Sequence, residues 1–235
     1  KLGVEVEFLP GDWRHGADPE AIEKRLRADG DKRLKAVCVV HNETSTGVAS
    51  RIPEVRKAID AAGHPALFMV DTISSLASID YRHDEWGVDV TVAGSQKGLM
   101  LPPGLSFNCI SPKALAASKS ANLPRAYWGW DEMIANGKGG YFPYTPATNL
   151  LYGLREALKM VLDEEGLDAV FARHQANLAA FLAGCFTGDL RLTRASLQDV
   201  LIEPQRKRLI PGFERAKEAA MAQGALGCSI SGSGP

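Results

Sequence analysis

The feature that most restricts the fold is a regular alternation of apolar runs and helix-start signals along the first two-thirds of the chain. Continuous apolar runs occupy residues 36–40, 66–70 and most of 88–92, and a further strand is expected at 105–110. The helix N-termini expected from the sequence lie before, between and after these runs, at Asp18-Pro19, Pro53 and Ser111-Pro112. Runs without polar alternation indicate strands buried on both faces, as in parallel sheets. The sequence therefore predicts an α/β fold with a mostly parallel sheet covered by helices.

The pattern changes after about Pro146. Helical apolar spacing over 148–164 and 166–183, with Gly166 between the two segments, predicts two consecutive helices. Beyond them we expect a polar stretch, a helix over 211–223 and a short strand at 228–230. The last third of the chain is therefore organised differently from the alternating part.

Composition and charge exclude several classes of protein. Apolar residues make up 45% of the 235 residues and charged residues 23%, which excludes a disordered or fibrous chain. Lysine and arginine total 27 against 28 acidic residues, so the net charge of −1 argues against nucleic acid or a membrane surface as partner. The four cysteines lie far apart, which predicts no disulfide framework and no metal site. Free thiols and the absence of an apolar stretch of roughly 18 residues favour a cytoplasmic protein.

Polar clusters follow three of the predicted strands. They are HNETSTG at 41–47, DTISS at 71–75 and GSQKG at 94–98. Ligands of parallel α/β sheets bind at the carboxyl ends of the strands. A lysine and a carboxylate on neighbouring strand ends are the pair that pyridoxal phosphate chemistry requires, since the lysine forms the internal aldimine and the carboxylate keeps the pyridine nitrogen protonated.

Each of these residues also has a simpler interpretation. Asp71 could cap its loop, Lys97 could be a solvated surface charge, and Asn42 and Thr44 could satisfy local turns. Their order on successive strand ends favours the coenzyme interpretation over these alternatives.

Residues 1–173 resemble a known family. HNETSTG, VDTISSLAS, GSQKGLMLPPG and FPYTPATNLLYGLREAL are similar to the class V, fold-type I pyridoxal-phosphate aminotransferases, and most similar to the serine–glyoxylate aminotransferases. The resemblance implies part of a fold-type I large domain, with Lys97 as the Schiff-base lysine and general acid/base. It also implies that Asp71 pairs with the pyridine nitrogen, that Gln96 contacts the coenzyme phosphate, and that Asn42 and Thr44 line its hydroxyl side.

The same resemblance implies a reaction and an assembly. The reaction is transfer of an amino group from serine or alanine to glyoxylate, so the partners are a small amino acid and a 2-oxo acid. Thr145 is expected to reach the phosphate of a neighbouring subunit, which implies a homodimer. A tyrosine often accompanies that threonine; the aligned position is Phe142, with Tyr141 and Tyr144 adjacent. The tyrosine's role is left open, and the sequence does not fix the amino donor.

Residues 174–235 resemble a different family. HQANLAAFLAGCFTGDL, SLQDVLIEPQRKRLIPGF and GALGCSISGSGP are similar to the C-terminal part of bacterial homoserine kinases, which belong to the GHMP kinases. The resemblance implies an α+β segment in which SGSGP is a glycine-rich loop beside the phosphate-transfer site. The basic residues 206–208 have a simpler interpretation as a solvated face. The kinases' nucleotide loop, of the type P-x-x-x-G-L-G-S-S-A, has no counterpart in this chain.

The sequence thus predicts two partial enzymes, residues 1–173 and 174–235, joined near Arg173-His174. Lys1 begins the chain without methionine and a glycine-rich turn ends it, so we expect both ends to be cut. The aminotransferase part would lack the N-terminal phosphate loop and the C-terminal arginine that binds the substrate carboxylate. Three hypotheses follow: an aminotransferase, a homoserine-kinase-type phosphotransferase, or an inactive chimera. A natural fusion, a misassembled gene and a designed chimera would share this sequence.

Overall fold

The computed structural model describes residues 3–198 and 203–229. Within them the chain forms two compact units. The first comprises residues 3–76 and 81–156 and contains the sheet; the second comprises 77–80, 157–198 and 203–229 and is built from helices. No helix in the described part of the chain is both long enough and apolar enough to cross a membrane.

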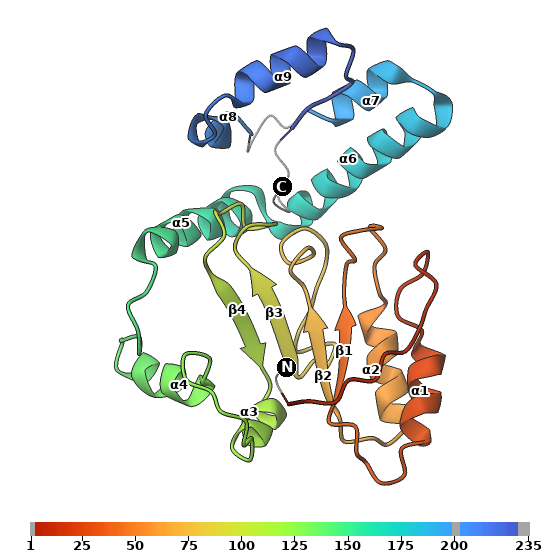
Figure 1. Ribbon diagram of the computed structural model, residues 1–235, viewed down its shortest axis with the longest axis vertical. Helices are drawn as coiled ribbons and strands as arrows, with labels where there is room; N and C mark the ends of the chain where they lie inside the picture. The colour runs from red at the N-terminus through yellow and green to blue at the C-terminus, as the bar shows by residue number, and fades with distance from the viewer. Residues whose placement is uncertain (1–2, 199–202, 230–235) are drawn as a thin grey trace. The chain divides into compact units, whose positions relative to one another are not determined.

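The first unit contains one four-stranded sheet in the order β1-β2-β3-β4 (Figure 1). Its strands are β1 (Ala36–Val40), β2 (Leu67–Asp71), β3 (Val90–Gly94) and β4 (Ser106–Ile110). The first three are parallel and β4 is antiparallel to β3. Val40, Asp71 and Val92 are register partners, so the carboxyl ends of β1, β2 and β3 meet at one edge. The predicted α/β fold with a mostly parallel sheet is confirmed, with β3 beginning two residues later than predicted.

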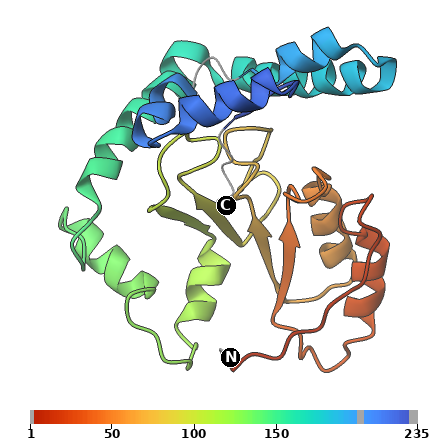
Figure 2. The same ribbon diagram turned by 45° about the horizontal axis from the view of Figure 1, so that its top comes forward.

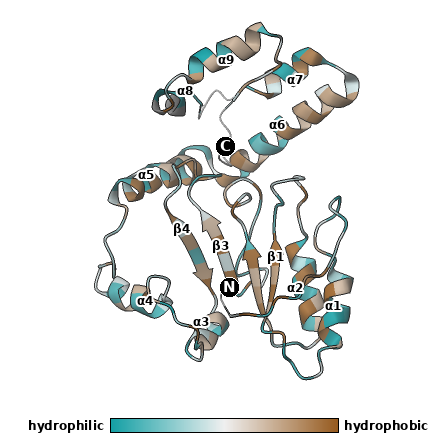
Figure 3. Cartoon of the chain, in the orientation of Figure 1, coloured by the Kyte–Doolittle hydropathy of each residue, from teal (hydrophilic) through white to brown (hydrophobic). Residues whose placement is uncertain are grey.

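Two helices cover one face of this sheet. They are α1 (Pro19–Arg27), whose N-cap Asp18 accepts from the backbone of Glu20 at 2.9 Å, and α2 (Ile52–Ala61). In Figure 3 β1 and β2 are largely apolar, whereas α1 and α2 also carry polar residues. The buried cluster takes residues from both helices and from alternate strand positions: Ile22, Leu26, Ile52, Val55, Ile59, Val39, Phe68 and Val70. Because strand side chains alternate, Met69 and Asp71 lie on the opposite face, which α1 and α2 do not cover.

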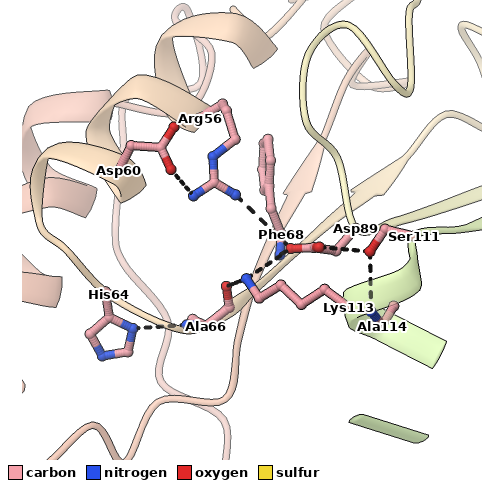
Figure 4. Close-up of polar contacts among 9 residues, drawn as sticks. All are labelled: Arg56, Asp60, His64, Ala66, Phe68, Asp89, Ser111, Lys113 and Ala114. Atoms are coloured by element: carbon pink, nitrogen blue, oxygen red, sulfur yellow. Dashed lines mark hydrogen bonds and ion pairs between the residues drawn. The ribbon is translucent and has the colours of Figure 1, made fainter. Parts of the chain in front are cut away.

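A buried carboxylate joins the amino ends of β2 and β3 (Figure 4). Asp89 accepts hydrogen bonds from Phe68 N at 2.8 Å, Ser111 Oγ at 2.8 Å and Lys113 Nζ at 3.2 Å. Burial alone raises the pKa of Asp89, but these donors lower it below its ordinary value. On the far side Arg56 lies 4.0 Å from the carboxylate and pairs with Asp60. Asp89 therefore fixes the start of β3 against β2 and against the helix that follows β4.

A second buried pair lies between α1 and β2. Oδ2 of Asp29 accepts from Leu34 N at 2.8 Å and contacts Nε2 of His64 at 3.1 Å. Nδ1 of His64 accepts from Ala66 N at 3.1 Å, so Nε2 carries the ring proton and donates it to Asp29. The backbone hydrogen bonds lower the pKa of Asp29 to about 2.

Three helices follow β4: α3 (Pro112–Ser118), α4 (Trp130–Lys138) and α5 (Thr148–Leu158). The predicted cap of α3 is confirmed, since Oγ of Ser111 accepts from Ala114 N at 3.1 Å. No residue of α4 is buried. Large exposed side chains gather in and around α4, namely Tyr127, Trp128, Met133, Ile134, Tyr141, Phe142 and Tyr144.

In the second unit, a π-helical turn at Lys159–Glu165 continues α5 along the chain. Gly166, with φ of +84°, then starts α6 (Leu167–Thr187). The two predicted helices separated by Gly166 are therefore confirmed, although the first changes to π geometry before it ends. The remaining helical elements of this unit are α7 (Leu190–Ser196), α8 (Glu203–Arg206), a 3₁₀ turn (Lys207–Leu209) and α9 (Phe213–Ala222) (Figure 2).

The residues that the structure describes near the end of the chain do not form the strand predicted at 228–230. Cys228 and Ser229 are not in a strand, and Ile230 lies outside the described residues, as does the glycine-rich SGSGP. The apolar spacing at 228–230 was too short to establish a strand without a partner to pair with. The expected junction near Arg173 falls inside α6, where the helix continues without interruption.

Candidate functional site

Three turns leave the carboxyl edge of the sheet and carry the predicted coenzyme residues. The carboxylate of Asp71 is exposed at the end of β2, on the face that α1 and α2 do not cover. Its Oδ1 accepts from the backbone of Ile73 at 2.8 Å. This turn orients the carboxylate and leaves it accessible to a ligand.

Lys97 lies in the turn that follows β3 and is half-buried. Its carbonyl accepts from Met100 N at 2.8 Å, and Met100 adopts a φ of +61°. Beneath the turn, the fully buried hydroxyl of Ser95 donates to Pro102 O at 2.8 Å and accepts from Leu105 N at 3.2 Å. One buried hydroxyl thus closes the loop that presents Lys97.

The amide of Gln96 lies over the end of β3. A Cβ atom at Gly94 would be 2.8 Å from Oε1 of Gln96 and 3.2 Å from Cδ1 of Ile73. Gly94 points to the same face as Val92, the register partner of Asp71. The Gln96 amide therefore lies on the Asp71 face, next to the Asp71 turn, and the absence of a side chain at Gly94 makes room for it.

The turn after β1 supplies the other two predicted residues. Nδ2 of Asn42 donates to Gly47 O at 3.2 Å, within the turn. The hydroxyls of Thr44 and Ser74 are 2.7 Å apart, so this turn is in direct contact with the Asp71 turn. Both the backbone and the hydroxyl of Ser45 donate to Glu43, which lowers the pKa of Glu43.

Thr145 lies elsewhere. It is exposed in the segment between α4 and α5, which in Figures 1 and 2 runs beyond β4 and does not cross the ends of β2 and β3. Neighbouring Tyr141 and Phe142 are exposed, while Tyr144 donates to Glu132 at 3.2 Å. Partial burial, together with the Glu132 carboxylate, raises the pKa of Tyr144. The structure brings five of the six predicted residues to one edge and leaves Thr145 apart from them.

Sequence reasoning did not single out the polar residues beneath this edge. They belong to the quoted motifs, but nothing in their spacing distinguished buried hydroxyls from exposed ones. The structure shows Thr72, Ser75 and Ser95 as fully or almost fully buried between accessible Asp71, Gln96 and Lys97. The one sequence signal that could have identified these residues is their position in a loop that directly follows a strand.

The predicted residues at the carboxyl edge have the chemical groups that pyridoxal phosphate binding requires. An amine can hold the aldehyde, a carboxylate can hold the protonated ring nitrogen, and amide and hydroxyl groups can bind phosphate and ring hydroxyl oxygens. Asp71, Gln96 and Lys97 provide three of these groups on neighbouring turns, while Asn42 and Thr44 provide the polar groups of the third turn.

Comparison with known families divides the chain in two. The family "Aminotransferase class-V" matches residues 1–186, and "GHMP kinases C terminal" matches residues 178–235. Both predicted resemblances are thereby confirmed. The two matches overlap on α6, a few residues after the predicted junction.

The aminotransferase part has similar relatives. It is 54% identical over 179 residues to serine–glyoxylate aminotransferase of Methylorubrum extorquens, covering 74% of this chain and 44% of the relative. It is 46% identical over 172 residues to L-aspartate–glyoxylate aminotransferase of Paracoccus denitrificans, covering 73% and 43%. The chain thus spans less than half the length of these relatives.

A solved structure supports the fold. The ureidoglycine–glyoxylate aminotransferase of Bacillus subtilis aligns with a TM-score of 0.66 at 29% identity, covering 77% of this chain and 46% of that one. This similarity confirms the prediction of a partial fold-type I aminotransferase fold.

Proposed function

The chain belongs to the class-V aminotransferase family, and from this premise we propose that it carries the lysine-bearing part of a pyridoxal-phosphate-dependent transamination site. One observation carries the proposal. Asp71 and Gln96 lie on one face at the carboxyl edge, next to the closed turn that holds Lys97. A carboxylate, an amide and an amine on adjoining turns are the groups that this coenzyme needs.

Each residue would have a separate task. When bound, pyridoxal phosphate supplies the electron sink that makes the Cα proton of an amino acid removable. Lys97 would fix the coenzyme covalently and, once released, move that proton as general base and acid. The Asp71 carboxylate would hold a proton on the ring nitrogen. Gln96 would donate to phosphate, and Asn42 and Thr44 would face the ring hydroxyl.

Substrate choice rests on the relatives. The three enzymes compared above are named for three different amino donors and share glyoxylate. We therefore propose glyoxylate as the 2-oxo acid. For the amino donor we propose serine or alanine, which the resemblance of the sequence motifs implies.

Assembly and location belong to the same proposal. We propose a homodimer in which Thr145 serves the partner's coenzyme, because Thr145 is exposed and lies away from its own chain's carboxyl edge. We also propose a cytoplasmic location, which the four free cysteines support.

The two-part organisation is proposed in the same way. Residues 1–173 would carry the transamination chemistry, and 174–235 would add a GHMP-kinase-like segment without phosphotransfer activity. Phosphoryl transfer needs a nucleotide held in line with its acceptor, and the chain has no counterpart of the kinases' nucleotide loop.

The test is to label the lysine that captures the coenzyme. The purified chain is incubated with pyridoxal phosphate, reduced with borohydride and mapped by mass spectrometry. We expect the label on Lys97, and we expect it to be lost in Lys97→Arg and retained in Lys113→Arg. Lys113 is a suitable control because it is bound to Asp89 at the other edge of the sheet. Label on another lysine would overturn the assignment, and absence of any label would favour the inactive chimera.

A further inference from the structure

His41 joins the turn after β1 to the turn after β2. Its backbone N–H donates to Asp71 O at 2.9 Å, and its carbonyl accepts from Ser50 N at 2.8 Å. Its ring Nδ1 is 3.0 Å from Oγ of Ser75, in a hydrogen bond whose donor depends on the ring tautomer. His41 is 5% exposed and Ser75 is 1% exposed. The contact is therefore shielded from water.

Aromatic side chains fix the orientation of the His41 ring. The ring centroids of Tyr81 and Trp86 lie 5.3 Å and 5.9 Å from it. Tyr81 and Trp86 also contact each other edge-on at 5.4 Å. Such tilted and edge-on contacts favour a defined ring orientation. The imidazole is consequently held with Nδ1 directed at Ser75.

Besides the backbone hydrogen bond from His41 N to Asp71 O, two side-chain contacts link the two turns. The inner link is the buried His41–Ser75 hydrogen bond, and the outer link is the contact between the hydroxyls of Thr44 and Ser74. Thr44 is exposed, so water competes for the outer link. A hydrogen bond shielded from water is stronger than an equivalent exposed one. Of the two side-chain contacts, the inner link should therefore contribute more to holding the two turns at a fixed separation.

We propose that His41 is a positioning residue for the coenzyme site, acting through Ser75. The inference rests on the proposed function, since one of the turns that His41 joins carries Thr44 and the other carries the Asp71 carboxylate. A coenzyme ring that binds both groups needs them at a fixed separation. His41 itself is buried, and we assign it no catalytic task.

A purely structural histidine would behave differently. Its loss would lower the stability of the unit. The mobility of these two turns would then rise no more than it does when a comparable hydrogen bond elsewhere in the unit is lost. Tyr81 offers that comparison, because its part-buried hydroxyl is 2.5 Å from Oγ1 of Thr91 in β3 of the same unit, a bond that involves neither turn. Tyr81→Phe removes that bond and keeps the ring against His41.

The first experiment measures hydrogen exchange of the full chain without coenzyme. The variants are His41→Phe, which keeps a ring between Tyr81 and Trp86, Ser75→Ala, and the two combined. Loss of one buried hydrogen bond of about 1 kcal/mol predicts exchange roughly fivefold faster at amides 42–48 and 72–76. We expect the same increase in both single variants, little further increase in the double variant, and no change at these amides in Tyr81→Phe.

The second experiment measures the affinity of the same variants for pyridoxal phosphate by absorbance. A loss of severalfold in His41→Phe and Ser75→Ala, with Tyr81→Phe unchanged, is expected. Unchanged exchange in the two turns, or an equal increase in Tyr81→Phe, would overturn the role of His41. If the wild-type chain captures no coenzyme, the proposed function fails, and the exchange experiment still decides whether His41 and Ser75 hold the turns together.

Discussion

Replacing Asp89 by alanine should destabilise the sheet-containing unit by about 3 kcal/mol. The substitution removes the acceptor shared by Phe68 N, Ser111 Oγ and Lys113 Nζ. The side chain of Asp89 is only 7% exposed, so these donors meet it in a region that water does not reach easily. Asp89→Ala therefore leaves buried polar groups without their acceptor.

The magnitude follows from what each donor can do afterwards. Phe68 is fully buried, so its N–H is left unsatisfied at a cost of about 1–3 kcal/mol. Breaking a buried ion pair costs about 3–5 kcal/mol when the remaining charge stays buried. Lys113 is 45% exposed and can regain water, which places the total at about 3 kcal/mol, the lower end of that range. Asp89→Asn keeps an oxygen for Phe68 N and should cost about 1 kcal/mol.

The assay is urea unfolding at neutral pH followed by tryptophan fluorescence. All four tryptophans, Trp13, Trp86, Trp128 and Trp130, belong to the sheet-containing unit, so the signal reports on that unit. Asp60→Ala is the matched control, because Asp60 pairs with Arg56 at 2.6 Å but is 66% exposed, and such pairs contribute at most about 1 kcal/mol. The reasoning is refuted if Asp89→Ala costs no more than Asp60→Ala.

Three further predictions test other parts of the chain. Backbone hydrogen bonds hold the pKa of Asp29 at about 2, below its ordinary 3.8, so the free energy of unfolding should fall as pH drops from about 4 toward 2. Urea unfolding at several pH values should show a smaller fall in Asp29→Asn than in the wild-type chain. The same dependence of the unfolding free energy on pH in both proteins would contradict this. Gly94→Ala should displace the Gln96 amide and weaken pyridoxal phosphate binding severalfold in a titration, with wild-type affinity as the contrary result. Gly184→Ala would place a Cβ atom 2.7 Å from Thr193 N and should destabilise the helical unit by about 1–3 kcal/mol, measured by circular dichroism after urea titration; unchanged stability would show that α7 can move aside.

Much of the fold could be predicted because the relevant signals are local. Asp18 and Ser111 cap helices through their own side chains, and Gly166 separates two helices through its backbone conformation. The start of β3 was misplaced because apolar residues mark burial, whereas a strand begins where its backbone enters the ladder. Val88 is buried but precedes the pairing of Val90 with Met69.

The candidate site was predictable only in part. Lys97 and Asp71 follow strands, and parallel strands bring such residues to one edge whatever the details of packing. The His41–Ser75 contact and the closure of the loop by Ser95 depend on how turns fold back over one another. His41 and Ser75 are 34 positions apart, and Ser95 reaches back to Pro102 across the loop, so neither contact follows from a local sequence pattern.

The continuous helix α6 has a practical consequence for anyone who wishes to express the two family segments separately. A cut at residue 173 would leave 167–173, about two turns of helix, on one fragment and an uncapped remainder on the other. A cut at Gly166 would pass through a residue whose φ of +84° already ends one helical segment before the next begins. The boundary suited to cloning is therefore Gly166, which precedes residues 178–186, where the two family matches overlap.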